Sequence, residues 1–144
     1  MVEFDPRLDY PLGSRRPDLV TTPAGTPLEA LTLSALREGR IDPPELRATA
    51  ETLRRQSAIA RAAGRAELAD NLARAAELAS IPDDVILGAY TALRPHRSTA
   101  SELDEWADRL ESRYGAGLVA AFVRDARSAY ADRNLLKVER GRAL

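Results

Sequence analysis

The sequence predicts an all-α protein, with an extended N-terminal arm at residues 1–25 and a compact helical domain at residues 26–144. Apolar residues recur at spacings of three and four beyond the arm. Start and stop signals of helices alternate along the same segment, and no run shows the alternation of a half-buried strand. A chain of 144 residues suits a single domain, and these signals predict a bundle of about six or seven helices.

Prolines distinguish the arm, because five of the nine in the chain lie within its first 27 residues. Proline fixes φ and lacks a backbone N–H, so regular helix and central strand are not expected there. The arm also carries Tyr10, Leu12 and Val20, which is more apolar character than a disordered linker usually has. We therefore predict that it lies on a surface, either of this chain or of a partner.

Capping signals predict the first helices after the arm. The sequence TPLE at residues 26–29 fits a capping box with proline at the first helical position, and Gly39 suits the end of that helix. The sequence DPPE at residues 42–45 repeats the start signal for a short helix. Thr49 or a neighbour then begins a longer helix, which is predicted to end near Gly64.

Four further helices follow from the same kind of signal. One runs from about Arg65, and another starts at residues 82–84 and ends before Pro95. Residues 99–102 form a capping box for the next helix, and the last begins after Gly117. Their apolar faces are expected to include Leu68, Leu72, Ile86, Tyr90, Leu93, Leu103, Trp106, Leu110, Tyr114, Leu118, Phe122 and Tyr130.

Composition excludes several classes of function. The net charge is −1, which argues against binding nucleic acid or an anionic membrane over a broad surface. The absence of cysteine excludes thiolate chemistry and disulfides. No apolar run approaches the roughly 20 residues of a membrane helix, and the N-terminus has no secretion signal, so a cytoplasmic protein is expected.

The sequence offers no convincing catalytic, cofactor-binding or metal-binding residues. His96 is the one histidine, and between Pro95 and Arg97 it is interpreted as an ordinary loop residue. A Ser-His-Asp triad would have to use it. Asp83 and Asp84 fit the first turn of a helix, where carboxylates complement the helix dipole. These observations favour a binding or assembly role.

Several motifs resemble the small subunit of adenosylcobalamin-dependent diol and glycerol dehydratases. The pattern T-L-R-x-Q-x-x-I-A-x-x-A-G-R lies at residues 52–65, and A-L-R-P-x-R-S-T lies at residues 92–99. The resemblance runs from about Asp9 to about Arg133. The remaining matches are DYPL at 9–12, RAAEL at 74–78, PDD at 82–84, LESRY at 110–114 and AAFVRDARSAY at 120–130.

The resemblance implies a role inside a larger enzyme. Such enzymes convert a 1,2-diol or glycerol to an aldehyde and water, using adenosylcobalamin held by the other subunits. The large barrel subunit holds the substrate and a metal ion, and the medium subunit helps to hold the cobalamin. The small subunit packs on the large one, supplies no known catalytic residue, and takes part in a dimer of heterotrimers. No nucleic acid or membrane partner is expected.

The resemblance also bears on localisation. Some relatives carry an amphipathic extension before the shared region that directs them into a bacterial microcompartment. In this sequence eight residues, MVEFDPRL, precede Asp9. So short a leader favours a free cytoplasmic enzyme.

Four residues are candidates for the subunit interface: Tyr10, Leu12, Arg94 and Arg97. Arg94 has two interpretations, since it can cap carbonyl groups of the ending helix or reach a partner. For Arg97 the interface is favoured over a helix cap, because arginine is enriched at interface hot spots. Two other hypotheses remain open at this point: a stand-alone helical adaptor or regulator, and a small enzyme that uses His96.

Overall fold

The computed structural model describes residues 3–138, where helices are the regular elements and no strand occurs. The predicted all-α class is confirmed. Thr21 and Pro27 form an isolated antiparallel bridge. The α-helices are α1 (Leu12–Arg15), α2 (Leu33–Arg37), α3 (Ala50–Ala62), α4 (Ala66–Leu78), α5 (Asp83–Ala92), α6 (Ala100–Tyr114) and α7 (Gly117–Asp132), and the 3₁₀ turns are η1 (Pro17–Leu19), η2 (Leu28–Ala30) and η3 (Pro43–Leu46).

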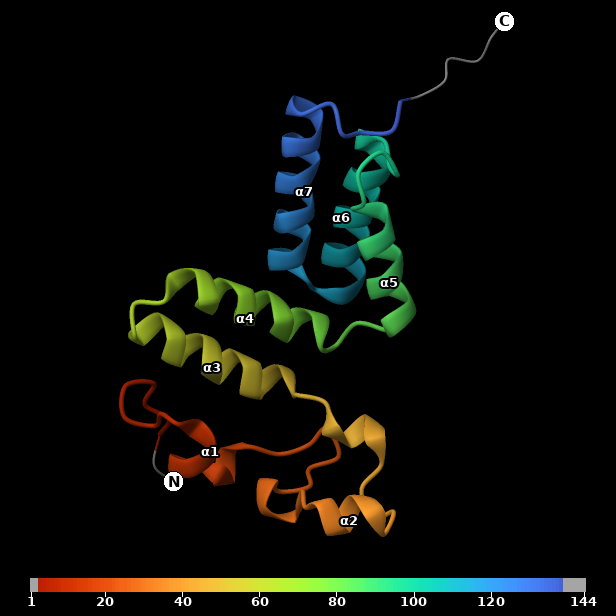
Figure 1. The fold of residues 1–144 in the computed structure, drawn as a ribbon. Helices are drawn as coiled ribbons and strands as arrows, with labels where there is room; N and C mark the ends of the chain where they lie inside the picture. Colours follow the sequence, from red (N-terminus) through yellow and green to blue (C-terminus); the bar gives the residue numbers. More distant parts are fainter. Residues whose placement is uncertain (1–2, 139–144) are drawn as a thin grey trace, which may run out of the picture. The chain divides into compact units, whose positions relative to one another are not determined.

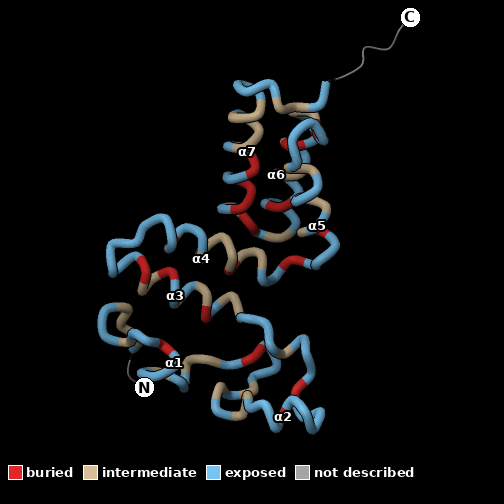
Figure 2. The backbone as a smooth tube through the Cα atoms, in the orientation of Figure 1, coloured by how far each residue is buried: buried red, intermediate tan, exposed pale blue. Residues whose placement is uncertain are grey.

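The chain divides into two compact units, Met1–Ala79 and Ser80–Leu144. The first unit contains the N-terminal arm and α2, α3 and α4, and the second contains α5, α6 and α7 (Figure 1). Each unit has buried residues of its own (Figure 2).

A helical hairpin of α3 and α4 organises the first unit. Thr49 caps α3 by accepting a hydrogen bond from the Thr52 N–H, as the sequence predicts. Gly64, with φ of 76°, lies in the turn before α4. The Ser57 hydroxyl donates to the Ala69 carbonyl at 2.7 Å, so a buried polar side chain joins the two helices. Ala69 is itself fully buried, and its small side chain allows the helices to approach closely.

The arm is not extended throughout, because α1 and η1 each form a short helical turn in it. Pro11 lies at the N-cap of α1 and Pro17 at the start of η1, positions that tolerate proline. Arg16 joins these turns by ion pairs with Asp9 and Asp18. Its hydrogen bond to Asp18 lowers the pKa of that carboxyl.

Hydrogen bonds and burial fix the arm to the rest of the first unit, and the Thr22 hydroxyl donates to Glu45 at 3.3 Å. The Arg55 side chain on α3 donates a hydrogen bond to the Leu19 carbonyl at 2.9 Å. Leu12 is 6% exposed and so belongs to the core of this unit. The sequence predicted that the arm lies on a surface of this chain or of a partner. The structure shows that at least part of the arm lies on this chain.

The expected capping box at Thr26 is wrong. Thr26 instead donates its hydroxyl hydrogen to Glu45 at 2.7 Å, and Pro27 is extended. Only the short turn η2 follows, and α2 begins later, with Thr32 as its N-cap. The stop signal at Gly39 is correct, since this residue adopts a φ of 68° just beyond α2.

The second unit is built on α6 and α7, with α5 packed against α6. The predicted capping box is confirmed: Thr99 accepts from the Glu102 N–H at 3.2 Å, and Glu102 accepts from the Thr99 N–H at 2.8 Å. Gly88 on α5 lies against Trp106 on α6, since a Cβ at Gly88 would stand 2.7 Å from the indole. The buried hydrophobic residues of this unit are Ile81, Val85, Leu103, Ala107, Leu110, Ala116, Val119, Ala120 and Val123.

The predicted face of α7 is partly wrong. Leu118 and Phe122 are about half exposed, at 50% and 49%, whereas Val119 and Val123 are buried. Tyr90 on α5 is likewise exposed, at 69%. On α7 the exposed pair Leu118 and Phe122 and the buried pair Val119 and Val123 have the same spacing of four residues. The two pairs lie about 100° apart around the helix, so periodicity alone does not predict which pair is buried.

Candidate subunit interface

The four interface candidates differ in how far the structure exposes them. Tyr10 is 67% exposed, and Arg94 and Arg97 are also exposed. Leu12 is buried in its own unit, which leaves little of its side chain for a partner. All four stay predictions as interface residues, and Tyr10 and the two arginines have the surface that such a role requires.

The loop RPHRST at residues 94–99 connects α5 to α6, and one hydroxyl from α7 and one from the loop itself satisfy carbonyl groups that end α5. The Tyr130 hydroxyl donates to the Leu93 carbonyl at 2.5 Å, and the Ser98 hydroxyl donates to the Ala92 carbonyl at 2.9 Å. Tyr130 and Ser98, and not Arg94, therefore cap these carbonyl groups of α5. Within residues 3–138, the side chains of Arg94 and Arg97 form no hydrogen bond or ion pair.

The segment after α7 holds the backbone of this loop. The His96 N–H donates to the Leu135 carbonyl at 2.7 Å, and the Lys137 N–H donates to the Ser98 carbonyl at 2.8 Å. His96 adopts a φ of 61°, a left-handed conformation. Arg97 also borders a hollow of about 300 Å³. The loop thus presents two arginines from a backbone that is fixed on both sides.

Tyr130 is a residue whose role the sequence did not reveal, and its replacement tests the loop anchor. We expect Tyr130→Phe to lower the free energy of unfolding by about 1 kcal/mol, because the Leu93 carbonyl loses its donor. Urea unfolding measures the change, and amide exchange should quicken at His96. Tyr114→Phe is the control, since the Tyr114 hydroxyl has no hydrogen bond in the described part of the chain. Equal stability of both variants would contradict the anchor.

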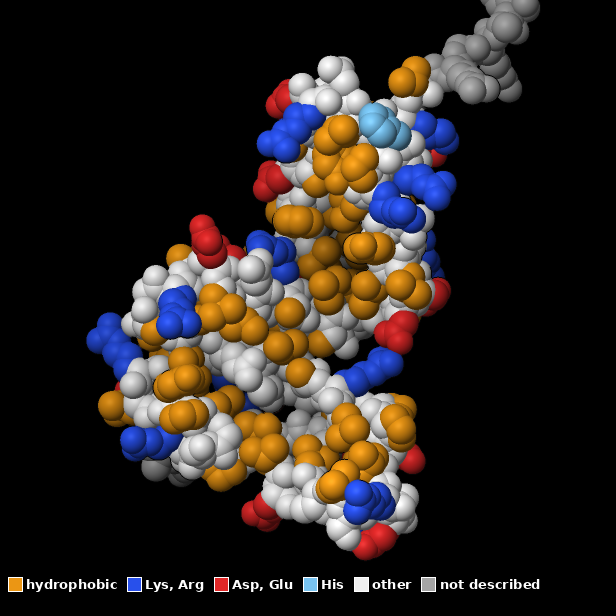
Figure 3. Space-filling model, in the orientation of Figure 1, with side chains coloured by type: hydrophobic (Ala, Val, Ile, Leu, Met, Phe, Trp, Pro, Cys, Tyr) orange, Lys and Arg blue, Asp and Glu red, His pale blue; other side chains and the backbone are white. Residues whose placement is uncertain are grey.

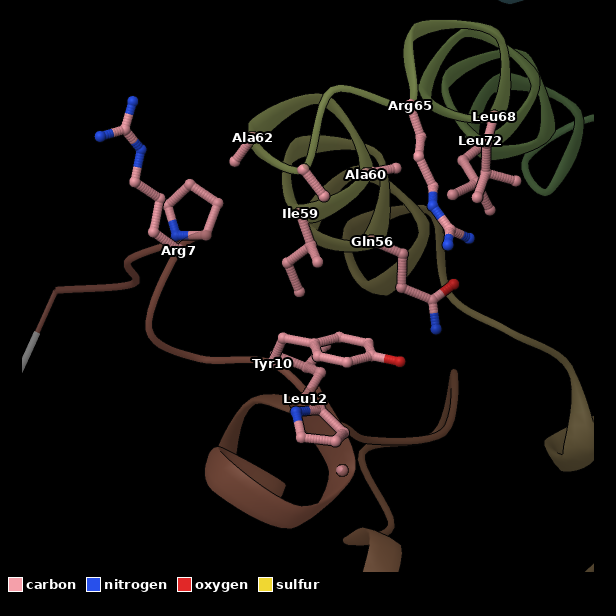
Figure 4. Close-up of a pocket in the computed structure, with 14 residues that line it drawn as sticks. Arg7, Tyr10, Leu12, Gln56, Ile59, Ala60, Ala62, Arg65, Leu68 and Leu72 are labelled. Atoms are coloured by element: carbon pink, nitrogen blue, oxygen red, sulfur yellow. The ribbon is translucent and has the colours of Figure 1, made fainter.

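A cavity of about 680 Å³ lies in the first unit, between the arm and the helical hairpin. Tyr10 and Leu12 approach it from the arm, Ile59 from α3 and Leu68 from α4 (Figure 4). Sequence reasoning missed it, because its walls come from segments far apart in the chain. A usable signal was the family resemblance itself. Two of the motifs that carry it, DYPL at 9–12 and the pattern at 52–65, both contribute residues to the lining of this cavity.

Large apolar side chains are also exposed on the second unit. Leu87 and Tyr90 on α5 are 63% and 69% exposed, and Leu118 and Phe122 on α7 are about half exposed. Figure 3 shows hydrophobic side chains gathered over a face of this unit. Exposed apolar patches of this kind are typical of protein–protein contact.

The described residues assemble no metal-binding cluster and no Ser-His-Asp triad. Residues 3–138 include no group of three or more histidines and carboxylates that could hold a metal ion. The His96 side chain forms no hydrogen bond there, so no Ser-His-Asp arrangement is assembled. None of the helices in that range has the length and apolar character to cross a membrane.

Comparison with known proteins identifies the family. The family model described as "Dehydratase small subunit" matches residues 6–137. The propanediol dehydratase small subunits of Citrobacter freundii and of Salmonella typhimurium strain LT2 are each 48% identical to this chain over 129 residues. These matches cover 90% of this chain and 75% of each relative. The chain therefore belongs to the dehydratase small subunit family.

Proposed function

We propose that this chain is the non-catalytic small subunit of a coenzyme B12-dependent diol or glycerol dehydratase, and that it packs on the large catalytic subunit. The observation that carries the proposal is the 48% identity to propanediol dehydratase small subunits over 90% of the chain. As a small subunit, the chain works with other dehydratase subunits. We further propose that these are a large barrel subunit and a medium subunit, assembled as a cytoplasmic dimer of heterotrimers.

We further propose that the other subunits hold the cofactor, as the family resemblance implies. The linings of the two cavities described above include no histidine. Adenosylcobalamin would supply the radical chemistry from those subunits when bound. This chain contributes contacts between subunits.

Reconstitution tests the proposal. The isolated chain is expected neither to dehydrate propane-1,2-diol nor to bind adenosylcobalamin, whereas the chain mixed with its two partner subunits should give cobalamin-dependent aldehyde. Aldehyde formation and corrinoid absorbance on gel filtration are the measurements. Large and medium subunits without this chain form the control.

Two outcomes would contradict the proposal. Corrinoid absorbance that co-elutes with the isolated chain would show that the chain itself holds the cofactor. A stable, monodisperse chain that ignores both dehydratase subunits and binds an unrelated protein would favour a stand-alone adaptor.

A further inference from the structure

The cavity beside Tyr10 differs in charge from the chain that forms it. Its lining includes two arginines, Arg7 and Arg65, and no carboxylate. The whole chain has 21 lysines and arginines against 22 aspartates and glutamates. Both charged residues of the lining are thus basic, and Arg65 is the one that faces the cavity in Figure 4, which favours an occupant that carries negative charge.

Three polar groups lie along the same side of the cavity. In Figure 4 the Tyr10 hydroxyl, the Gln56 carboxamide and the Arg65 guanidinium are found there, whereas Arg7 points away. Each can donate hydrogen bonds. Within the part of the chain that the structure describes, none of these three side chains has a hydrogen bond or an ion pair. The cavity therefore has a donor-rich side that the chain itself leaves unused.

The remaining walls are apolar. Leu12 and Ile59 come from the arm and α3, and Leu68 and Leu72 come from α4. A volume of about 680 Å³ lies within the range of sites that enclose sizeable apolar groups. A small inorganic anion would use the donors and leave these walls unfilled. The combination favours an occupant with a carboxylate next to a large apolar group.

We propose that this cavity receives a segment of a partner dehydratase subunit in which a carboxylate lies beside a large apolar side chain. The inference rests on the proposed function, since it requires a partner subunit. Arg65 pairs with the carboxylate, and Gln56 and Tyr10 donate hydrogen bonds to it. The apolar side chain fills the space against Ile59 and Leu72. Docking then buries an arginine that is exposed in the free chain.

Charge reversal at Arg65 gives the sharpest test. We expect Arg65→Glu to weaken association of the full chain with its partner subunits by about thirtyfold or more, because two carboxylates then meet in a buried site. Tyr10→Phe removes one donor and should weaken it less. Arg37→Glu is the matched control: Arg37 is exposed on α2, lies outside the cavity lining, and should leave association unchanged.

Arg65→Glu is expected to leave the fold of the first unit intact, so a loss of association would report on docking. Residue 65 is the N-cap of α4, and a carboxylate at that end of a helix suits the helix dipole. Circular dichroism and thermal melting of each variant confirm that the helices form. Arg65→Gln removes the charge without reversing it, and it should lie between the wild-type chain and Arg65→Glu in affinity.

A photo-crosslinking residue in place of Tyr10 identifies the occupant in the assembled complex. Crosslinks to a partner segment with Asp, Glu or a chain terminus beside an apolar residue would support the inference. Crosslinks only to a second copy of this chain, or to a segment without a carboxylate, would overturn it.

These experiments distinguish a wrong docking site from a wrong proposed function. If the wild-type chain associates with its partners and Arg65→Glu associates equally well, the cavity is not the docking site, while the proposed function stands. If the wild-type chain fails to associate with dehydratase subunits at all, the proposed function is wrong and the inference fails with it.

Discussion

Charge reversal at Arg97 is expected to weaken assembly of the small subunit with its dehydratase partners by about thirtyfold to more than a thousandfold. The range corresponds to the cost of about 2–5 kcal/mol for breaking a buried, hydrogen-bonded charge pair. Within residues 3–138 the Arg97 side chain has no hydrogen bond or ion pair, so a partner can use the whole guanidinium. Sedimentation or pull-down with the partner subunits measures the loss.

A control from the same loop separates docking from catalysis. His96 has a φ of 61°, and asparagine tolerates this conformation better than alanine does. His96→Asn should therefore leave both assembly and turnover nearly unchanged. If it abolishes turnover while assembly stays intact, the loop takes part in chemistry. If Arg97→Glu instead lowers the melting temperature of the isolated chain, Arg97 has a structural role within this subunit.

Truncation of Leu110 is expected to cause a large loss of stability in the second unit. Leu110 is 1% exposed in the core of that unit, and leucine-to-alanine changes at such sites cost about 2–5 kcal/mol. Urea unfolding followed by circular dichroism measures the change. Leu87→Ala is the matched control, because Leu87 is 63% exposed and should change the free energy of unfolding by less than about 0.5 kcal/mol.

The same pair of variants separates stability from docking. Leu87 belongs to the exposed apolar side chains of the second unit, so its loss should affect association more than folding. A Leu110→Ala protein as stable as the wild type would mean that this helical core does not hold the unit together.

Local signals predicted those features of the fold that depend on neighbouring residues. The capping box at Thr99 and Glu102 is found as expected, because both hydrogen bonds lie within a single helical turn. Gly64 and Gly39 end helical segments for a similarly local reason, since each adopts a positive φ. Thr26 shows the limit of such signals: its side chain is taken by Glu45, a residue 19 positions away.

Features that depend on tertiary contacts were not predictable. The choice between Leu118 and Val119 as the buried side of α7 depends on where α6 lies, and periodicity does not contain that information. Tyr130 reaches Leu93 over 37 residues of sequence. The cavity likewise requires Tyr10 and Arg65, which lie 55 positions apart in the sequence, to line the same space. The candidate site was therefore only partly visible: Arg97 and Tyr10 were identified, but their surroundings were not.

On the proposed function, the two candidate docking surfaces would make the small subunit a bivalent binder, because each lies in a different compact unit. One candidate surface, around Arg65, lies in the first unit, and the other, around Arg97, lies in the second. When both surfaces engage the same assembly, the second contact forms within an existing complex and strengthens binding without any new contact. Two contacts that are weak on their own can then produce tight assembly, and either unit alone would bind far more weakly than the intact chain.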